Sequence, residues 1–166
     1  AADEDTTIWS AYAQLQTYKA EVPSLLAYNE LLVVSDGLQA RVGSLTANQE
    51  WFKIWRTIHG DRDAPAGTLE LEVLIRGIFE PQRFLDLIHH FIAFEDDPDR
   101  GTVNKIIAGY HQFHAVNAAV EETTRASGMS DVTAAREDAG SFWAGQMHGG
   151  KPGDRRAGVV WHTQGS

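Results

Sequence analysis

The sequence predicts an α/β protein, and three observations support this prediction. Apolar residues recur at the helical spacing i, i+3, i+4 in several separate stretches. A continuous apolar run at residues 31–35 is followed by Asp36-Gly37 and then by alternating apolar and polar residues, which is the pattern of a β-hairpin. A compact apolar run at residues 157–161 has the length and composition of a short buried strand.

The composition is that of an ordinary globular protein. The 166 residues are 43% hydrophobic and 22% charged, which suits one domain or parts of two adjoining domains. The absence of cysteine excludes disulfides and Cys-ligated metals, and it fits a cytoplasmic protein. A net charge of -9 argues against a chain that coats DNA by general attraction, and no apolar run approaches the roughly 20 residues of a membrane span.

The first predicted element is a helix over residues 5–19, capped by Asp5 or Thr6 and ended before Pro23. Its apolar residues share one face, which we expect to be buried. These residues are Ile8, Tyr12 and Leu15.

Gln14 and Tyr18 lie four residues apart, so they meet on a neighbouring face of this helix. Taken by themselves, they are most simply a half-exposed polar pair.

The hairpin follows, with its first strand at residues 31–35 and its second at residues 38–42. Beyond it, Trp51, Phe52 and Trp55 form an aromatic surface that we expect to pack on the hairpin. The alternative is an exposed platform for nucleic-acid bases.

Residues 59–67 are rich in turn formers and predict a solvated linker. A metal loop at His59, Asp61 and Asp63 is the weaker alternative, because the further oxygen ligands of a calcium loop are missing. Two helical patterns follow at residues 71–79 and 84–92, which we expect to pair, and an acidic turn is predicted at residues 95–100.

A further helix is predicted from Gln112, with Phe113, Val116 and Val120 as its buried stripe. His111 and His114 could share a face, but no third metal ligand is evident.

Residues 127–156 contain six glycines and predict a loop, with any helix limited to about residues 131–138. The apolar run at residues 157–161 then leads into a glycine-bearing turn, which is how a phosphate-binding loop begins. The last residues, Gly165 and Ser166, fall where that loop needs its Gly-Lys-Ser/Thr ending. We therefore expect a piece of a larger nucleotide-driven enzyme, cut within its phosphate loop.

Four stretches in this order resemble the restriction (R) subunit of type I restriction-modification enzymes. In that family a PD-(D/E)xK nuclease is fused to a superfamily 2 DNA translocase. Each stretch is weak or moderate by itself, and the resemblance covers essentially the whole chain. The stretches are residues 8–19, 28–37, 108–117 and 155–166.

The resemblance implies a division of the chain into three parts. Residues 1–58 would be the C-terminal part of a RecB-like nuclease fold, made of a helix and a β-hairpin. Residues 59–102 would be a helical connector. Residues 103–166 would begin the helicase or translocase domain, including the first strand of a RecA-like motor.

The resemblance also implies roles for particular residues. Gln14 and Tyr18 match the Gln-x-x-x-Tyr motif that follows the catalytic lysine of these nucleases, and so become a DNA-contacting or site-organising pair. The metal-binding acids of the nuclease would precede Ala1. Gln112 matches the glutamine that reads adenine, by the bidentate pairing that an amide makes with this base. Four residues would lie on the phosphate loop: Thr163, Gln164, Gly165 and Ser166.

The parent implied by this resemblance is an ATP-dependent type I site-specific deoxyribonuclease that translocates and cleaves double-stranded DNA. It would use ATP and Mg²⁺ and work with modification and specificity subunits, while the chain alone would be inactive and bind ATP very weakly at most. Two alternatives remain open at this point: a non-catalytic DNA-binding or scaffold domain, and a part of another superfamily 2 helicase.

Overall fold

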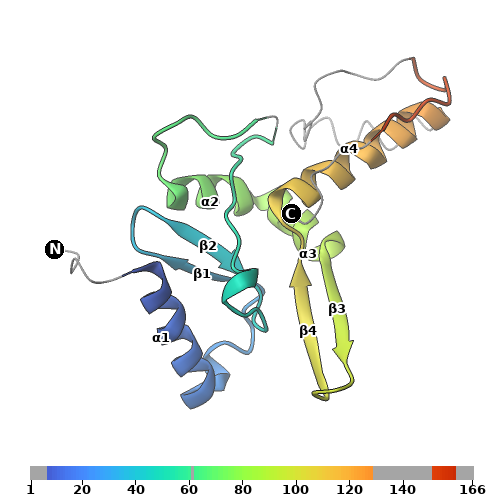
Figure 1. Ribbon diagram of the computed structural model, residues 1–166. Coiled ribbons are helices and arrows are strands. Elements are labelled where there is room, and N and C mark those ends of the chain that lie inside the picture. The colour runs from blue at the N-terminus through green and yellow to red at the C-terminus, as the bar shows by residue number, and fades with distance from the viewer. Residues whose placement is uncertain (1–6, 61, 129–150, 160–166) are drawn as a thin grey trace. The chain divides into compact units, whose positions relative to one another are not determined.

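The computed structural model describes residues 7–60, 62–128 and 151–159 of the chain (Figure 1). The chain divides into two compact units. The first contains residues 1–58 and 64–110, and the second contains residues 59–63 and 111–166. Helices and two small antiparallel sheets are both present, so the predicted α/β class is confirmed at that level.

The first unit begins with helix α1 (Ile8–Glu21), which ends close to where the sequence predicts. Pro23 disfavours helical backbone in the residue before it, and Val22 is accordingly non-helical. Pro23 then starts the short 3₁₀ helix η1 (Pro23–Leu25). The N-cap differs from the expectation, because it is Thr7, whose side chain makes no capping hydrogen bond.

The predicted hairpin is confirmed as strands β1 (Leu32–Ser35) and β2 (Ala40–Gly43). Its turn is longer than the Asp-Gly signal suggests, since Ser35 pairs with Ala40. The Asp36 carboxylate accepts hydrogen bonds from the backbone N–H groups of Leu38 and Gln39, at 2.9 and 2.7 Å. These bonds hold Leu38 out of the strand, and its side chain is 68% exposed, not buried as the alternation predicts.

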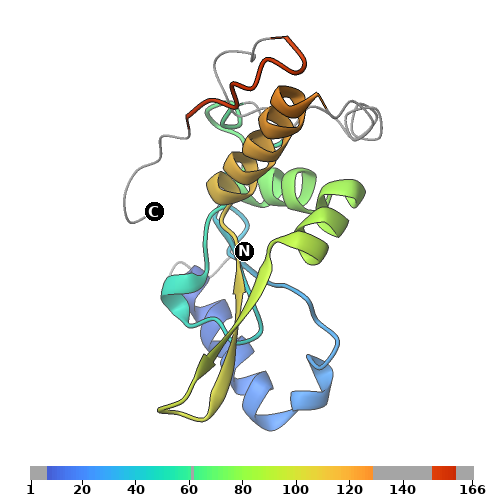
Figure 2. The same cartoon turned by 90° about the vertical axis from the view of Figure 1, so that its right-hand side faces the viewer.

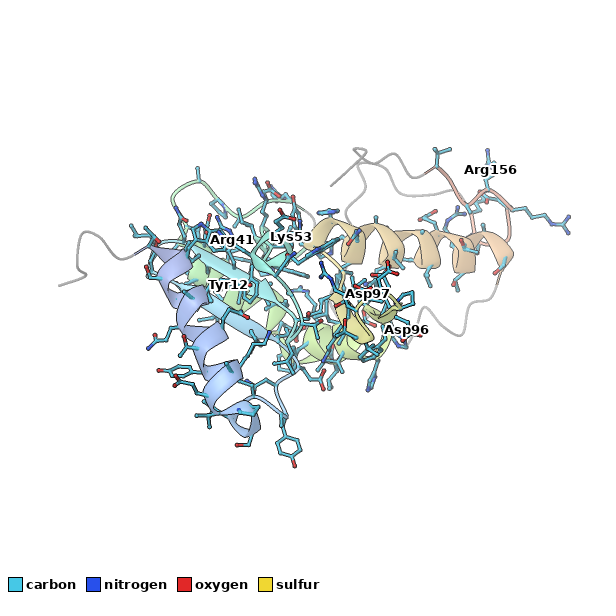
Figure 3. All side chains as sticks on the ribbon, turned by 60° about the horizontal axis from the view of Figure 1, so that its bottom comes forward. Tyr12, Arg41, Lys53, Asp96, Asp97 and Arg156 are labelled. Carbon is cyan, nitrogen blue, oxygen red and sulfur yellow. The ribbon has the colours of Figure 1, made fainter. Side chains whose placement is uncertain are left out.

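Helix α1 packs against strand β1, as Figure 1 shows. Tyr12 points from α1 toward the hairpin (Figure 3), where its ring meets the Phe52 ring edge-on at 5.1 Å between centroids. The buried core of this region contains Ile8, Leu26, Leu32, Val34, Ala47 and Phe52. The predicted packing of the aromatic cluster on the hairpin holds for Phe52, whereas Trp51, in the 3₁₀ helix η2 (Gln49–Trp51), is 53% exposed.

Helices α2 (Glu70–Ile78) and α3 (Pro81–His90) confirm the two helical patterns and contact each other. Glu80 caps α3 by accepting hydrogen bonds from the backbone N–H groups of Gln82 and Arg83. The Arg83 guanidinium is buried and donates hydrogen bonds to the carbonyl oxygens of Ile58 and Gly77. Burial lowers the pKa of Arg83, so these carbonyls stabilise a charge that is costly to desolvate.

A second antiparallel hairpin replaces the predicted end of the second helix, and the predicted acidic turn at residues 95–100 overlaps the turn of this hairpin at residues 98–101. Its strands are β3 (Ile92–Asp97) and β4 (Thr102–Ile107), paired from Ile92–Ile107 to Asp97–Thr102 (Figure 2). Asp96 and Asp97 lie in β3 near the turn (Figure 3). The helical spacing of residues 84–92 runs on into the strand, which is why periodicity alone places the boundary too late.

The second unit is built on helix α4 (Tyr110–Ser127), whose first residue belongs to the first unit. Its buried residues include Phe113, His114 and Asn117. Val116 and Val120 are 48% and 43% exposed, so the predicted stripe is wrong beyond Phe113. His114 instead lies against Gly60, where a Cβ atom would come within 2.8 Å of its ring. Polar His114 and Asn117 thus lie on the buried face of α4, where valines were predicted.

Candidate functional site

Gln14 and Tyr18 form a hydrogen-bonded pair on the exposed side of α1. The Nε2 atom of Gln14 donates to the Tyr18 hydroxyl oxygen at 2.9 Å. The opposite side of the helix is fixed by buried Ile8 and by the Tyr12–Phe52 contact. The pair is therefore held on a rigid element, with its polar atoms directed outward.

The polarity of this hydrogen bond decides what the pair can do. Because the Tyr18 hydroxyl accepts from Gln14, its own proton can be donated to another acceptor, such as a phosphate oxygen. The Gln14 amide keeps a second N–H donor and a carbonyl acceptor. An amide and a phenol arranged in this way can orient a phosphate backbone, but they supply neither a nucleophile nor a metal ligand.

Gln112 lies in the first turn of α4, and its side chain is exposed. The four other residues assigned to the nucleotide, Thr163, Gln164, Gly165 and Ser166, lie outside the described residues, as does the predicted helix at 131–138.

The predicted strand at residues 157–161 is not formed in the part that the structure describes. Residues 157–159 are exposed and form no strand, Gly158 has a φ of 98°, and Val159 is 91% exposed. A buried strand needs neighbours that accept its backbone hydrogen bonds, and no described residue pairs with this segment. The apolar composition of residues 157–161 therefore does not make a strand at 157–159.

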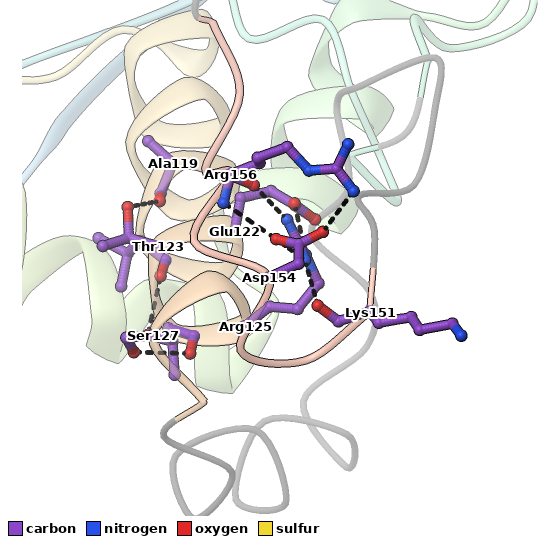
Figure 4. A network of polar contacts seen from close by, with 10 residues as sticks. Ala119, Glu122, Thr123, Arg125, Ser127, Lys151, Asp154 and Arg156 are labelled. Atoms are coloured by element: carbon purple, nitrogen blue, oxygen red, sulfur yellow. Dashed lines mark hydrogen bonds and ion pairs between the residues drawn. The ribbon is translucent and has the colours of Figure 1, made fainter.

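Arg125, near the end of α4, holds the segment at residues 151–156 (Figure 4). Its Nη1 atom donates to the Lys151 carbonyl oxygen at 2.9 Å and to Asp154 Oδ1 at 3.1 Å. Its Nη2 atom donates to the Arg156 carbonyl oxygen, and its Nε atom pairs with Glu122 at 2.8 Å. A single guanidinium thus uses its fork of donors on four partners.

The backbone of the same segment completes the end of α4. The N–H groups of Gly153 and Arg155 donate to the carbonyl oxygens of Arg125 and Ala126, at 2.8 and 3.0 Å. Carbonyls in the last turn of a helix have no partner within the helix, so this segment satisfies two of them. Arg155 adopts a φ of 65°, a left-handed conformation that is uncommon for a residue with a side chain.

The charges of this cluster reinforce each other. The hydrogen bond to Glu122 raises the pKa of Arg125, and Asp154 raises it further. The backbone N–H of Arg156 lowers the pKa of Asp154, and Arg125 lowers it further. Arg125 and Asp154 are therefore both charged at neutral pH.

Sequence reasoning missed the role of Arg125. Its nearest partner is three residues away, a helical spacing that the sequence does reveal, but Asp154 is 29 residues away and no spacing rule connects the two. Only the folded chain brings them together.

In the described part of the chain, no group of three or more His, Asp or Glu side chains is placed to hold a metal ion. None of the helices in that part has the length and apolar character to cross a bilayer.

Comparison with known proteins adds to this geometry. A family model described as the N terminus of type I restriction enzyme R proteins matches residues 2–51, which include α1 and the β1–β2 hairpin. The HindI endonuclease subunit of a type I restriction enzyme from Haemophilus influenzae is 37% identical over 98% of this chain. The MjaIXP endonuclease subunit of Methanocaldococcus jannaschii, also named as type I, is 27% identical over 96% of it. No solved structure matches the chain.

The named relatives are thus endonuclease subunits of type I restriction enzymes. The chain belongs to the family of type I restriction enzyme R proteins, which confirms the resemblance carried by the four sequence stretches. It spans 14% of the length of each of these two relatives.

Proposed function

We propose that this chain works within an ATP-dependent type I restriction endonuclease subunit, which translocates and cleaves double-stranded DNA. The observation that carries the proposal is the 37% identity, over 98% of the chain, to a protein named as a type I restriction enzyme endonuclease subunit. Since the chain corresponds to 14% of that relative, we propose that its activity is that of the larger subunit and that the chain alone cleaves no DNA and hydrolyses no ATP.

In this proposal the first residues belong to a nuclease domain. Residues 1–58 are the C-terminal part of a RecB-like fold, supported by the family match over residues 2–51 and by the α1–hairpin arrangement. Gln14 and Tyr18 orient the DNA backbone at the nuclease site, in keeping with their hydrogen bond on an exposed helix face. Mg²⁺ is held by the metal-binding acids of the nuclease in the larger subunit.

The remaining residues lead to the motor. Residues 59–102 connect the domains, and residues 103–166 begin a RecA-like translocase. Gln112 reads the adenine of ATP, which its exposed place at the start of α4 permits. Thr163, Gln164, Gly165 and Ser166 surround the phosphates with their backbone N–H groups. The proposed partners are double-stranded DNA and the modification and specificity subunits of the complex.

The test uses the full R subunit in complex with its partner subunits, with DNA cleavage and ATP hydrolysis measured side by side. A hydrogen bond to a charged group contributes about 1.5–3 kcal/mol, so Gln14→Ala and Tyr18→Phe should each slow cleavage by roughly 10- to 150-fold. ATP hydrolysis should be unchanged. Gln112→Ala should instead raise the KM for ATP.

The matched controls are Tyr28→Phe and Gln82→Ala, because Tyr28 is 97% exposed and both lie outside the proposed sites. Unchanged cleavage in both Gln14→Ala and Tyr18→Phe would remove the nuclease assignment. If these variants reduced complex assembly but left the cleavage and ATPase rates of each assembled complex unchanged, the non-catalytic scaffold would be the better reading.

A further inference from the structure

A pocket of about 270 Å³ lies in the first unit, apart from the residues assigned above. Its walls come from the end of β2, the loop that follows it, and strand β4. The residues that matter for its chemistry are Trp51, Lys53, Trp55, Arg100, Lys105 and Tyr110. Two indoles, a phenol and three cations therefore line one hollow.

Trp51 is the exposed indole of the two and is held in place by its backbone. The Asn48 side chain accepts hydrogen bonds from the N–H groups of Glu50 and Trp51, at 3.1 and 3.3 Å. Two residues on, Lys53 is fixed by paired backbone hydrogen bonds with Val42, both 2.9 Å. The Trp51 indole is 53% exposed, and its backbone is already held by hydrogen bonds. It therefore loses little conformational freedom when a ligand covers it.

Lys53 supplies a cation next to the indole. Its Nζ atom lies 5.1 Å from the centre of the Trp51 ring, and it forms no ion pair with any residue in the described ranges. The other two cations are partly neutralised, because Lys105 pairs with Glu30 and Arg100 lies 3.8 Å from Asp97. Glu95 also lines the pocket, so an anion would bind at the Trp51–Lys53 side.

Hydrogen bonds and a ring contact connect other residues that line the pocket. Thr46 donates a hydrogen bond to the Lys105 carbonyl oxygen at 3.2 Å and accepts one from its N–H at 2.6 Å, which joins the loop after β2 to β4. Buried Trp55 donates to the Thr57 carbonyl oxygen at 2.9 Å and meets Tyr110 edge-on. The pocket is thus preformed and not a gap between mobile loops.

We infer that this pocket binds an unpaired base of a DNA strand, stacked on Trp51, with the adjoining phosphate against Lys53. A flat exposed indole beside a cation is the arrangement that binds single strands without reading their sequence. In a duplex the base faces are covered by their neighbours, so only an unpaired base can stack on the ring. Arg100 also lines the pocket, but because it lies 3.8 Å from Asp97, Lys53 is the cation best placed to meet the phosphate. The inference goes beyond the proposed function, which assigns none of these residues and requires no unpaired base.

The chain itself can be tested by fluorescence anisotropy with a labelled oligothymidine strand of roughly 12 nucleotides at low salt. Loss of one stacked base should weaken binding by about 5- to 150-fold in Trp51→Leu, whereas Trp51→Phe should retain most of the affinity. Lys53→Gln should reduce the slope of log affinity against log salt by about 0.7, the value for one phosphate contact on a single strand. Affinity for the same sequence as a duplex should be nearly unaffected by the Trp51 substitutions.

Tyr28→Leu and Lys151→Gln are the matched controls, because each changes an exposed residue of the same type outside the pocket. Absence of strand binding by the wild-type chain would overturn the inference, as would equal affinities in Trp51→Leu and Tyr28→Leu. Full competition by ATP, with no dependence on strand length, would identify a mononucleotide site and overturn it too. None of these outcomes bears on the cleavage and ATPase measurements proposed for Gln14, Tyr18 and Gln112, so the two proposals fail separately.

Discussion

Arg125 and Asp154 are joined by a 3.1 Å ion pair across 29 residues of sequence, and this pair fastens the segment at residues 151–156 to the end of α4. Arg125 is also the donor to two carbonyl oxygens of that segment. Most of the side-chain attachment of the segment to the helix therefore depends on one guanidinium.

Arg125→Ala should release the segment without unfolding α4. The N–H groups of Gly153 and Arg155, which now donate to carbonyls at the helix end, should exchange with deuterium much faster. Hydrogen exchange resolved by residue measures this. Arg76→Ala removes an exposed arginine–glutamate pair in α2 and serves as the control, which should leave both amides protected. If these two amides were as protected in Arg125→Ala as in the wild type, the backbone hydrogen bonds alone would be enough to hold the segment.

Gly77→Ala should destabilise the first unit, although alanine favours helices. A Cβ atom at position 77 would lie 2.5 Å from the Trp55 indole nitrogen and would collide with the Thr57 carbonyl oxygen. Overpacking of this kind costs about 1–3 kcal/mol. Urea unfolding measures the loss, and Ile75→Ala, at a 53% exposed position of the same helix, should change stability by less than about 0.5 kcal/mol.

Substitutions on α4 test its buried face. Phe113 is fully buried, so Phe113→Ala should cost about 3–5 kcal/mol. Val116→Ala, one turn further on the exposed side, should have a small effect. Thermal unfolding measures the loss of unfolding free energy in each variant. Equal losses would support the apolar stripe that the sequence predicts.

Acid should weaken the β1–β2 turn through Asp36. Backbone hydrogen bonds from Gln39 and Leu38 lower the pKa of this carboxyl in the folded chain. A lowered folded-state pKa gives stability that is present above the unfolded value, near 3.9, and is lost as the pH falls through the folded value. Asp36→Asn keeps an acceptor but cannot titrate, so its unfolding free energy should fall less between pH 5 and pH 3 (about one unit either side of that value) than the wild type does.

The sequence anticipates elements whose signals are local. Helix α1 ends at a proline, the first hairpin turns at Asp36-Gly37, and α2 has an unbroken apolar face. The second hairpin was missed because Ile92 continues the helical spacing of α3, and its acidic strand lacks the apolar alternation of a half-buried one. Residues 92–97 form a strand because they pair with β4, and sequence periodicity carries no information about that pairing.

In the candidate site, too, contacts that follow from local spacing are predicted and contacts between distant residues are not. The Gln14–Tyr18 contact follows from a spacing of four on a helix, and the structure brings the two side chains together as expected. The pocket at Trp51 does not follow from spacing, because Lys105 and Tyr110 reach it from a different hairpin and helix. From the sequence, an exposed aromatic platform was only an alternative. The structure shows that Trp51 is exposed whereas Phe52 and Trp55 are buried.

The closing of α4 by residues 153–155 has a consequence for how this chain can be engineered. Gly128 and Gly153 come so close that a Cβ atom on the former would lie 3.5 Å from the Cα atom of the latter. Gly128 and Gly153 therefore nearly meet in space, and closing a flexible loop between two such points costs only about 0.6 kcal/mol more for each doubling of loop length. A fluorescent protein or an affinity tag grafted between these two glycines should be accommodated, giving a reporter that leaves the helix cap intact.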